Sequence, residues 1–212
     1  MSDIDLAGFW HTFYSEREQV WSGNPNVQLV AEVGDLAPGT ALDIGCAEGA
    51  DAIWLAQRGW RVTATDISAV AIERGKTQAE AAGVSELIEW QQNDLGVSFP
   101  SGQFDLVSAQ FFHSPIGRPR DATLRRAAAA VAPGGTLLIV SHLDAPGEHN
   151  HHPEIALPTQ AETVAGLELG DGWAEPVLDE RYRDGHDGHG GVRRVLDGVV
   201  RVRRNVDGRK KE

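Results

Sequence analysis

The sequence predicts an α/β fold: a doubly wound domain with a mostly parallel sheet of seven strands and an antiparallel hairpin at the C-terminal end. Three observations lead to this prediction. From residue 40 to residue 141, strand-like apolar runs alternate with segments of helical spacing. The first of these runs passes through a glycine-containing loop into a helix. Acidic residues stand at the ends of the first three predicted strands, at Asp43, Asp66 and Asp94.

Composition limits the possible partners. The 212 residues suit one domain, and 19 basic against 31 acidic residues give a net charge of -12. Such a charge repels nucleic acids and anionic membranes, so we expect neither as a partner. A single cysteine, Cys46, excludes an internal disulfide and fits a reducing cytoplasm. We find no leader-like start and no apolar run of membrane-spanning length, and we therefore expect a soluble cytoplasmic protein, as a monomer or homodimer.

The central segment of the chain is the stretch 40–56. An apolar strand ends at Ile44, Gly45 and Gly49 follow, and helical spacing of apolar residues begins at Ala52. Glycines let a backbone take a positive φ or approach a ligand closely, and the first turn of a helix has free N–H groups. The segment therefore predicts a cradle for a small ligand.

Two classes of nucleotide cofactor compete for this loop. A dinucleotide would call for G-x-G-x-x-G, which is absent here, and its pyrophosphate would meet Glu48. The loop instead resembles the Asp-x-Gly-x-Gly-x-Gly motif of class I S-adenosylmethionine (SAM) dependent methyltransferases, with Ala47 at the middle glycine. An added methyl group there is expected to crowd the cofactor or to widen the loop. The resemblance implies cofactor contacts from Asp43, Gly45, Cys46, Ala47, Glu48, Gly49 and Asp51.

The N-terminal segment, residues 3–22, predicts a helix with an aromatic face, and a short helix over 27–33 follows it. The first helix either packs into the core or forms a lid over the cofactor. In the second case Trp10, Tyr14 and Trp21 would face a sulfonium cation, and Arg17 would bind the methionine carboxylate. Aromatic N-terminal lids of this kind occur in small-molecule methyltransferases of the thiopurine and tellurite-resistance groups, which the chain resembles.

Strands are predicted over 61–68 and 87–92, with helices over 51–58 and 69–82 around the first of them. An acid about 20 residues beyond the glycines suits ribose hydroxyls, so Asp66 is the ribose candidate, although it can equally be a helix cap or turn residue. The resemblance implies that Asp94 binds the adenine amino group, and an Asx-turn is the alternative. Four neighbours of these two acids are further cofactor candidates: Ile67, Ser68, Asn93 and Leu95.

The fourth strand, 104–110, ends near the ligand-binding edge of such sheets, and the resemblance places Ala109, Gln110 and Phe111 beside the methionine part of SAM. His113 is the candidate catalytic base that would take a proton from a hydroxyl, thiol or amine, although it can instead form only local hydrogen bonds. The Asn/Asp-Pro-Pro-aromatic motif of DNA adenine methyltransferases is absent here. Its absence and the acidic charge both favour a small-molecule acceptor.

The C-terminal half continues with a helix over 121–132, a Pro-Gly-Gly turn and a strand over 136–141. The polar, His-rich loop 142–152 can face substrate, solvent or a metal, and no metal ligand is assigned. A capping box opens a helix over 159–169, and strands over 173–182 and 192–202 flank a turn at 184–191. The basic residues of 201–204 and 209–211 are interpreted as outward side chains of an edge strand and a frayed tail.

These features predict a single domain over residues 1–212 that transfers a methyl group from SAM to an oxygen, sulfur, nitrogen or metalloid atom of a small molecule. The segment 1–35 would be the lid, 38–142 the SAM-binding core, and 143–212 the substrate-side loop, helix and edge strands. A SAM-binding sensor or partner subunit without transferase activity is the alternative. An NAD-dependent oxidoreductase is a third hypothesis, which the missing glycine fingerprint disfavours.

Overall fold

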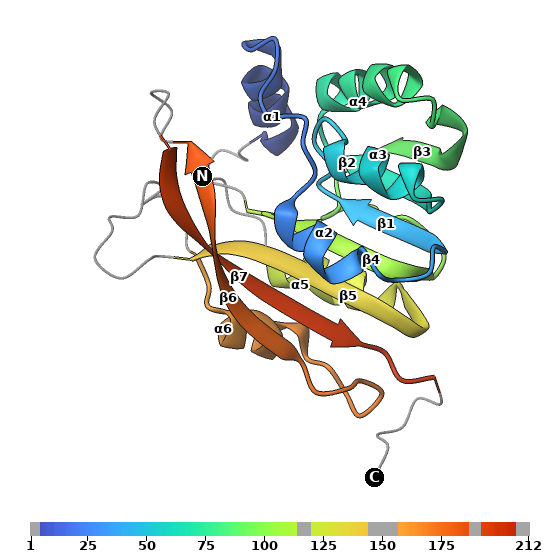
Figure 1. The fold of residues 1–212 in the computed structure, drawn as a ribbon, viewed down its shortest axis with the longest axis vertical. Coiled ribbons are helices and arrows are strands. Elements are labelled where there is room, and N and C mark those ends of the chain that lie inside the picture. Colours follow the sequence, from blue (N-terminus) through green and yellow to red (C-terminus); the bar gives the residue numbers. More distant parts are fainter. Residues whose placement is uncertain (1–4, 114–119, 144–156, 187–191, 207–212) are drawn as a thin grey trace.

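The computed structural model describes residues 5–113, 120–143, 157–186 and 192–206. Its centre is one seven-stranded sheet in the order β3-β2-β1-β4-β5-β7-β6 (Figure 1). Neighbours from β3 to β5 are parallel, whereas β5–β7 and β7–β6 are antiparallel. The strands are β1 Thr40–Ile44, β2 Arg61–Asp66, β3 Ile88–Gln92, β4 Phe104–Gln110, β5 Val131–Leu143, β6 Val177–His186 and β7 Val192–Arg203.

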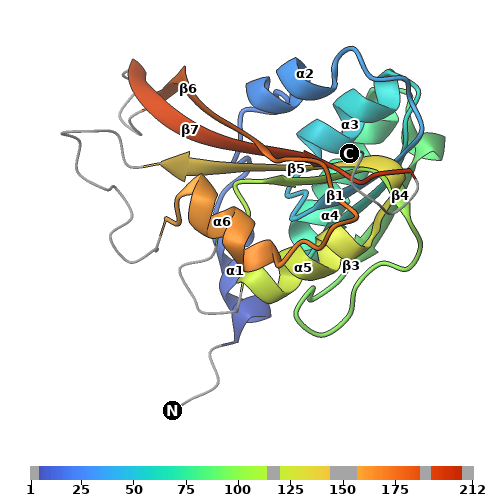
Figure 2. The same ribbon diagram turned by 90° about the horizontal axis from the view of Figure 1, so that it is seen from below.

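Helices cover both faces of the sheet, as the alternation of strands and helices predicts (Figure 2). The described α-helices are α1 Leu6–Ser15, α2 Val27–Val33, α3 Ala50–Gln57, α4 Ala69–Ala81, α5 Arg120–Ala129 and α6 Gln160–Leu167. A short 3₁₀ turn, Ser85–Leu87, precedes β3. No helix of the described part of the chain is both long and apolar enough to span a membrane.

Successive strand residues enter two separate cores because side chains alternate across a strand. Ala41, Leu106 and Leu138 belong to the core under α2, α3 and α4. Their neighbours Leu42 and Val107 belong to the core under α5 and α6. Because both faces are covered, the central strands carry apolar residues on both of their faces instead of on alternate positions alone.

The strand order reverses at β1, which lies between β2 and β4. In open α/β sheets, ligands bind beyond the carboxyl ends of the strands at such a point. The glycine loop after Ile44 and the segment after Gln110 both lie there, because β1 and β4 run parallel with Leu42 beside Val107. The fold therefore places the predicted cofactor and acceptor segments at one edge.

The C-terminal strands differ in detail from the prediction. β5 begins at Val131, because the Pro-Gly-Gly segment stays beside β4 through a register shift instead of forming a separate turn. β6 begins at Val177, and Trp173 forms only an isolated bridge to Arg204. β6 also continues to His186, past the start of the predicted turn, whose remaining residues 187–191 lie outside the described residues.

The prediction of an edge strand over residues 201–204 is wrong, because β7 lies between β5 and β6. Both faces of β7 carry buried valines, namely Val199 on one face and Val200 and Val202 on the other. These apolar side chains require packing partners on both faces of the strand. Two of the basic residues are engaged by other parts of the protein: Arg201 pairs with Glu32 at 3.1 Å, and Arg204, just after β7, donates to the carbonyl of Val131.

Candidate cofactor and acceptor site

The glycine loop takes three left-handed backbone conformations in five residues. Gly45 has a φ of 69°, Ala47 of 51° and Gly49 of 83°. The N–H groups of Gly45 and Cys46 both donate to the carbonyl of Thr65, at 2.8 and 3.0 Å, which fixes the loop to the end of β2. Alanine thus occupies a conformation that glycine takes without cost, so Ala47 strains the backbone instead of widening the loop.

The two glycines of the loop are required by packing as well as by φ. A Cβ atom at Gly45 would lie 2.8 Å from the ring of Phe112, and one at Gly49 would lie 2.3 Å from the ring of Trp90. A Cβ atom at Gly75, on α4, would meet the same Trp90 ring. Neither aromatic contact is evident from the sequence, because Phe112 and Trp90 come from segments far along the chain.

Asp66 organises the loop from the end of β2. One of its carboxylate oxygens accepts the N–H of Ala47 at 3.0 Å, and the other accepts the N–H of Ser68 at 2.8 Å. Each carboxylate oxygen can accept a further hydrogen bond, so ribose hydroxyls can still be bound. The Ser68 hydroxyl caps α4 by accepting the N–H of Ala71, and the Ile67 carbonyl accepts the side-chain amide of Gln92.

Two buried acids, Asp43 and Asp66, and the half-buried Asp51 gather at the loop. Burial, with the nearby charges of Asp51 and Asp66, raises the pKa of Asp43 well above its usual range. Burial raises the pKa of Asp51 to about 6, against a hydrogen bond from the Asn26 N–H that lowers it. Asp43 Oδ2 is buried without a hydrogen-bond partner. Such a cluster favours a cationic ligand, and SAM carries both a sulfonium and an ammonium group. These acids therefore fit the predicted cofactor.

The N-terminal segment is bound to the loop through Glu48, which is almost fully buried. Its carboxylate accepts the N–H of Trp21 at 3.1 Å and the N–H of Val20 at 3.3 Å. The same carboxylate pairs with Arg74 of α4 at 2.9 Å. Arg74 also donates to the backbone carbonyls of Tyr14 and Arg17. Glu48 thus holds the segment after α1 against the loop.

The aromatic residues of this segment form one cluster. Tyr14 is 3% exposed, and its hydroxyl accepts the indole N–H of Trp21 at 3.1 Å. The rings of Trp10 and Tyr14 lie 6.2 Å apart. Burial, and then the charge of the loop residue Asp66, raise the pKa of the Tyr14 hydroxyl. The N-terminal segment is attached a second time further along the chain, where the Asn26 N–H donates to the carboxylate of Asp51 at 2.6 Å.

Arg17 does not point into the loop. Its guanidinium donates to the carbonyl of Phe13 at 2.8 Å and lies over the Phe13 ring at 4.6 Å. The basic group that reaches the loop is Arg74, which the sequence did not single out. Its position on α4 gave no signal, because a lone arginine on an amphipathic helix is indistinguishable from a solvated one.

The segment after β3 is only partly available to a cofactor. Asp94 accepts the N–H of Gly96 at 2.9 Å, the Asx-turn considered as the alternative. The Asn93 N–H donates to the Asp66 carbonyl, which ties this segment to β2. Leu95 is buried in the core under α5, and its carbonyl accepts the Arg126 guanidinium at 2.9 Å. The Leu95 carbonyl is therefore already engaged.

At the end of β4, Ala109 is fully buried within the strand, so only its backbone could meet a ligand. The Gln110 side chain donates to the Ser108 hydroxyl at 2.9 Å, while its buried Oε1 has no hydrogen-bond partner. Phe111 has a φ of 50° and stacks on His142 at a ring distance of 4.1 Å. A positive φ at a bulky residue is a strained conformation of the kind found at binding sites.

His113 lies at the same edge, and neither ring nitrogen has a hydrogen-bond partner. Burial, followed by the charge of Arg120 and the neighbouring His142, lowers the pKa of His113 to about 3. The imidazole is therefore uncharged at neutral pH and a weak proton acceptor. This counts against its predicted role as catalytic base.

The His-rich loop 142–152 can be located only in part. Its residues 144–152 lie outside the described residues, and the described residues contain no group of three metal-binding side chains.

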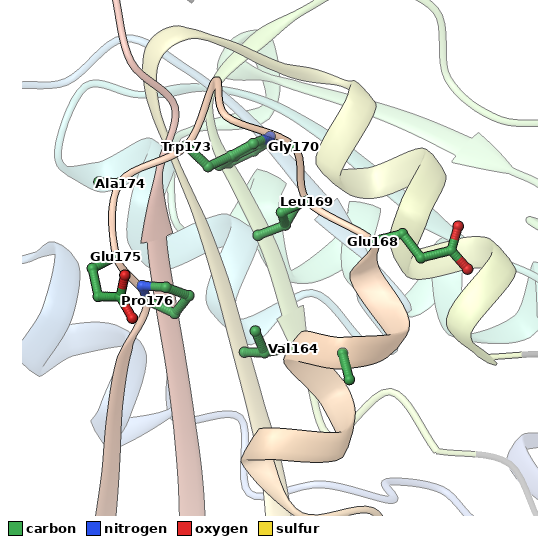
Figure 3. A pocket seen from close by; sticks show the side chains of 9 residues that line it. Val164, Glu168, Leu169, Gly170, Trp173, Ala174, Glu175 and Pro176 are labelled. Carbon is green, nitrogen blue, oxygen red and sulfur yellow. The ribbon is translucent and has the colours of Figure 1, made fainter. Parts of the chain in front are cut away.

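A pocket of about 300 Å³ lies between the end of α6 and the start of β6, with Leu169, Trp173 and Pro176 in its lining (Figure 3). Trp173 pairs with Arg204 beside Gly135, so this pocket lies at the sheet edge opposite the glycine loop.

A family model described as "Methyltransferase domain" matches residues 41–135. The chain is similar to ribosomal RNA small subunit methyltransferase C of Chromohalobacter salexigens, with 34% identity over 118 residues, 54% of this chain and 34% of that protein. Its fold matches a structure from a study of disulfide-to-thioacetal conversion in echinomycin biosynthesis (TM-score 0.76, 23% identity, 95% and 93% of the two chains).

A second similar structure is the N-methyltransferase NodS of Bradyrhizobium japonicum WM9 in complex with S-adenosylhomocysteine (TM-score 0.65, 20% identity). That match covers 92% of this chain and 97% of NodS. The chain spans only about a third of the length of the ribosomal RNA methyltransferases it matches. At these identities the two structural matches establish the fold alone.

Proposed function

We propose that this chain, whose residues 41–135 match a family model described as "Methyltransferase domain", is a class I SAM-dependent methyltransferase that transfers the methyl group of SAM to a small molecule. The observation that carries the proposal is the loop geometry: a strained glycine loop held by Asp66, above a buried acid whose Oδ2 lacks a partner. A phosphate-bearing cofactor would be repelled by this cluster, whereas a sulfonium is attracted to it.

We assign the cofactor roles to residues that the fold brings to this edge. Asp66 would bind the ribose hydroxyls and Asp43 the ammonium group, while Tyr14 and Trp21 would cover the cofactor from the N-terminal side. The segment after β3 would carry the adenine through the backbone of Asn93 and Asp94. Residues 1–35 would then be the lid, 38–142 the SAM-binding core and 143–212 the acceptor side.

The chemistry asks for little from the protein. The sulfonium of SAM supplies an activated methyl group, so the protein needs mainly to align the attacking atom with it. Alignment of two reactants can supply roughly 7 to 11 kcal/mol of the barrier. The Glu48 and Asp51 attachments of the N-terminal segment support this role, because they would hold that segment as a cover over the loop.

A small-molecule acceptor is supported by the net charge of -12, which opposes the approach of a polyanion. Two basic residues near the end of the chain add to this argument, because Arg201 is paired with Glu32 and Arg204 is bound to the carbonyl of Val131. Ribosomal RNA is the competing acceptor, favoured by the similarity to ribosomal RNA small subunit methyltransferase C.

Calorimetric titration with SAM, S-adenosylhomocysteine and NAD tests the cofactor. We expect micromolar binding of the first two and none of NAD. Replacing Asp66 by Ala should weaken SAM binding at least tenfold, whereas Asp171→Asn, an exposed acid outside the site, should leave it unchanged. Equal affinity for SAM in the Asp66→Ala protein would contradict the ribose assignment, and NAD binding would contradict the methyltransferase proposal.

The acceptor is tested by release of S-adenosylhomocysteine from SAM in the presence of phenols, thiols, amines or purified ribosomal RNA. Turnover of a small molecule without turnover of RNA supports the proposal. Turnover of RNA alone would assign the chain to the RNA-modifying enzymes. Tight SAM binding with no turnover of any acceptor would favour the sensor or partner-subunit hypothesis.

A further inference from the structure

A histidine–aspartate pair crosses from β5 to β7 at the acceptor side of the sheet. His142 and Asp197 are register partners on the two antiparallel strands. Asp197 is fully buried, and its Oδ2 accepts the Arg183 guanidinium at 2.7 Å and the Gln28 amide at 3.3 Å. Its Oδ1 faces His142 Nδ1 at 3.6 Å. The carboxylate is therefore positioned by two donors on one oxygen and presents the other to the imidazole.

The two facing atoms are both unsatisfied. Asp197 Oδ1 and His142 Nδ1 are buried and have no hydrogen-bond partner, because 3.6 Å is too long for a hydrogen bond. A buried carboxylate oxygen without a donor is costly, and a proton on Nδ1 is the group that would satisfy it after a small contraction. The carboxylate thus favours the tautomer with hydrogen on Nδ1, which leaves the lone pair on Nε2.

The pair lies beside the cofactor loop. Phe112 packs on Gly45, and the next residue, His113, has its ring 6.2 Å from that of His142. The His142 ring is also stacked on the ring of Phe111 at 4.1 Å. The His142 side chain is 36% exposed, whereas the nitrogens of His113 are buried. Of the two imidazoles, His142 is the one that an entering molecule can reach.

We propose that His142, positioned by Asp197, is the general base that receives the proton of a hydroxyl acceptor. This inference rests on the proposed methyltransferase function and names its acceptor class, a phenol-like O–H group. A hydroxyl needs a base at neutral pH because its oxygen is a poor nucleophile while it carries hydrogen. Asp197 is a positioning residue here, because it acts only through the imidazole.

In the proposed step, the acceptor oxygen forms a bond to the methyl carbon as its O–H bond breaks. The proton passes to His142 Nε2, and the imidazolium then carries a positive charge beside the Asp197 carboxylate. The bond between the methyl carbon and sulfur breaks with its electron pair left on sulfur, which gives S-adenosylhomocysteine. The imidazolium later returns the proton to water, so no oxidant or further reactant is needed.

Other charged groups face this pair from the surrounding elements. Arg183 of β6 binds Asp197 and lies over the Phe111 ring at 5.2 Å. Arg120 of α5 donates to the Ser141 hydroxyl at 3.0 Å, next to His142 in the chain, and its charge reaches His113. A bound acceptor at His142 would therefore meet a cationic surrounding, which also suits an oxygen that gains negative charge as its proton leaves.

The tautomer is tested by ¹⁵N NMR of histidine-labelled protein with S-adenosylhomocysteine bound, at a pH where the ring is uncharged. The spectrum of His142→Gln assigns the His142 signals. We expect Nδ1 protonated and Nε2 unprotonated, and Asp197→Asn should turn this into a mixture of tautomers. A protonated Nε2 in the unaltered protein would overturn the proposal, because that nitrogen could then accept no proton.

The chemistry is tested with phenol and thiophenol as matched acceptors. Thiophenol ionises readily, so its sulfur needs no base. We expect His142→Gln to lower kcat with phenol about 100-fold and to change kcat with thiophenol less than threefold. Asp171→Asn, an exposed acid outside the site, serves as the control and should change neither. An equal loss with both acceptors would mean a structural role and overturn the proposal.

Failure of this inference differs from failure of the proposed function. If S-adenosylhomocysteine does not bind in calorimetry, the methyltransferase proposal fails before the base is considered. If it binds but only thiophenol is methylated, and His142→Gln leaves that rate unchanged, the hydroxyl assignment is overturned while the methyltransferase proposal stands. Methylation of phenol that depends on His142, with the expected tautomer, supports both.

Discussion

The carboxylate of Asp66 accepts a hydrogen bond of 3.0 Å from the backbone N–H of Ala47, the alanine that replaces the middle glycine of the cofactor motif. This bond links the ribose candidate to the most strained position of the loop, where φ is 51°. The departure from the glycine motif is thus accommodated by a conformation that Asp66 helps to hold. The alanine strains the backbone at this position, but the backbone path of the loop is retained.

Replacing Ala47 by Gly tests this interpretation. Relief of the left-handed strain, roughly 1 to 2 kcal/mol, is offset by the greater freedom of glycine in the unfolded chain, about 0.4 to 1 kcal/mol. We expect the free energy of unfolding in urea to stay equal or to rise by up to about 1 kcal/mol, with SAM affinity undiminished. Ala81→Gly, on an exposed helical position of α4, should instead lose about 1 kcal/mol. A similar loss at both positions would contradict the strain at Ala47.

The second prediction concerns Gly49, where both φ and packing exclude a side chain. Gly49→Ala would set a methyl group against the Trp90 ring, and we expect a loss of about 3 kcal/mol or more in urea unfolding. Gly83 has a similar φ of 70° but open space around it, so Gly83→Ala should cost only about 1 to 2 kcal/mol. If the two costs are equal, the Trp90 contact does not restrict Gly49. Trp90→Leu in the Gly49→Ala protein should recover part of the loss.

The sequence predicted the parts of the structure that depend on local periodicity and on the chain's acids. The order of strands and helices, the glycine loop at Gly45 and Gly49, and the capping box at Thr159 and Glu162 follow from short-range patterns. A family model described as "Methyltransferase domain" matches residues 41–135, in agreement with the methyltransferase resemblance of the loop. Such features can be predicted from neighbouring residues in the sequence, without knowing which distant segments pack against them.

Contacts between distant segments could not be predicted in the same way. The Glu48–Arg74 pair, the Trp90 ring on Gly49 and the Asp197–His142 pair each join residues at least 26 positions apart. A charged or aromatic residue on a helix or strand looks alike in the sequence whether it meets solvent or a buried partner. The forked guanidinium of Arg17 suggests binding of the methionine carboxylate, yet the structure places it over the ring of Phe13.

The third prediction concerns the attachment of the N-terminal segment through Glu48. Glu48→Gln removes the charge that pairs with Arg74 and weakens the acceptor of the Val20 and Trp21 N–H groups. We expect at least tenfold faster hydrogen exchange of these two amides and weaker SAM binding, because the cover over the loop opens more often. Glu73→Gln removes an exposed pair with Lys76 and should change neither. Unchanged exchange at Val20 and Trp21 in Glu48→Gln would mean that other contacts hold the segment.

The last prediction follows from the acids under the loop. Burial raises the pKa of Asp51 to about 6, so Asp51 takes up a proton in the free protein as the pH falls through this range. Burial also raises the pKa values of Asp43 and Asp66. A cationic ligand favours the ionised carboxylates, so binding below pH 6 must expel protons and weakens as the pH falls. SAM carries one more positive charge than S-adenosylhomocysteine. We therefore expect SAM affinity to fall about tenfold between pH 7 and pH 5, and S-adenosylhomocysteine affinity to fall less.

Calorimetry of both ligands at several pH values measures this difference. Asp51→Asn keeps an oxygen to accept the Asn26 N–H but removes the titrating group, so the pH dependence of SAM binding should become shallower. Glu86→Gln, an acid of the 3₁₀ turn before β3, should leave the dependence as it is. If SAM and S-adenosylhomocysteine respond equally to pH, the acids do not sense the sulfonium charge, and the loop would bind the adenosine part of the cofactor without a contribution from this cluster.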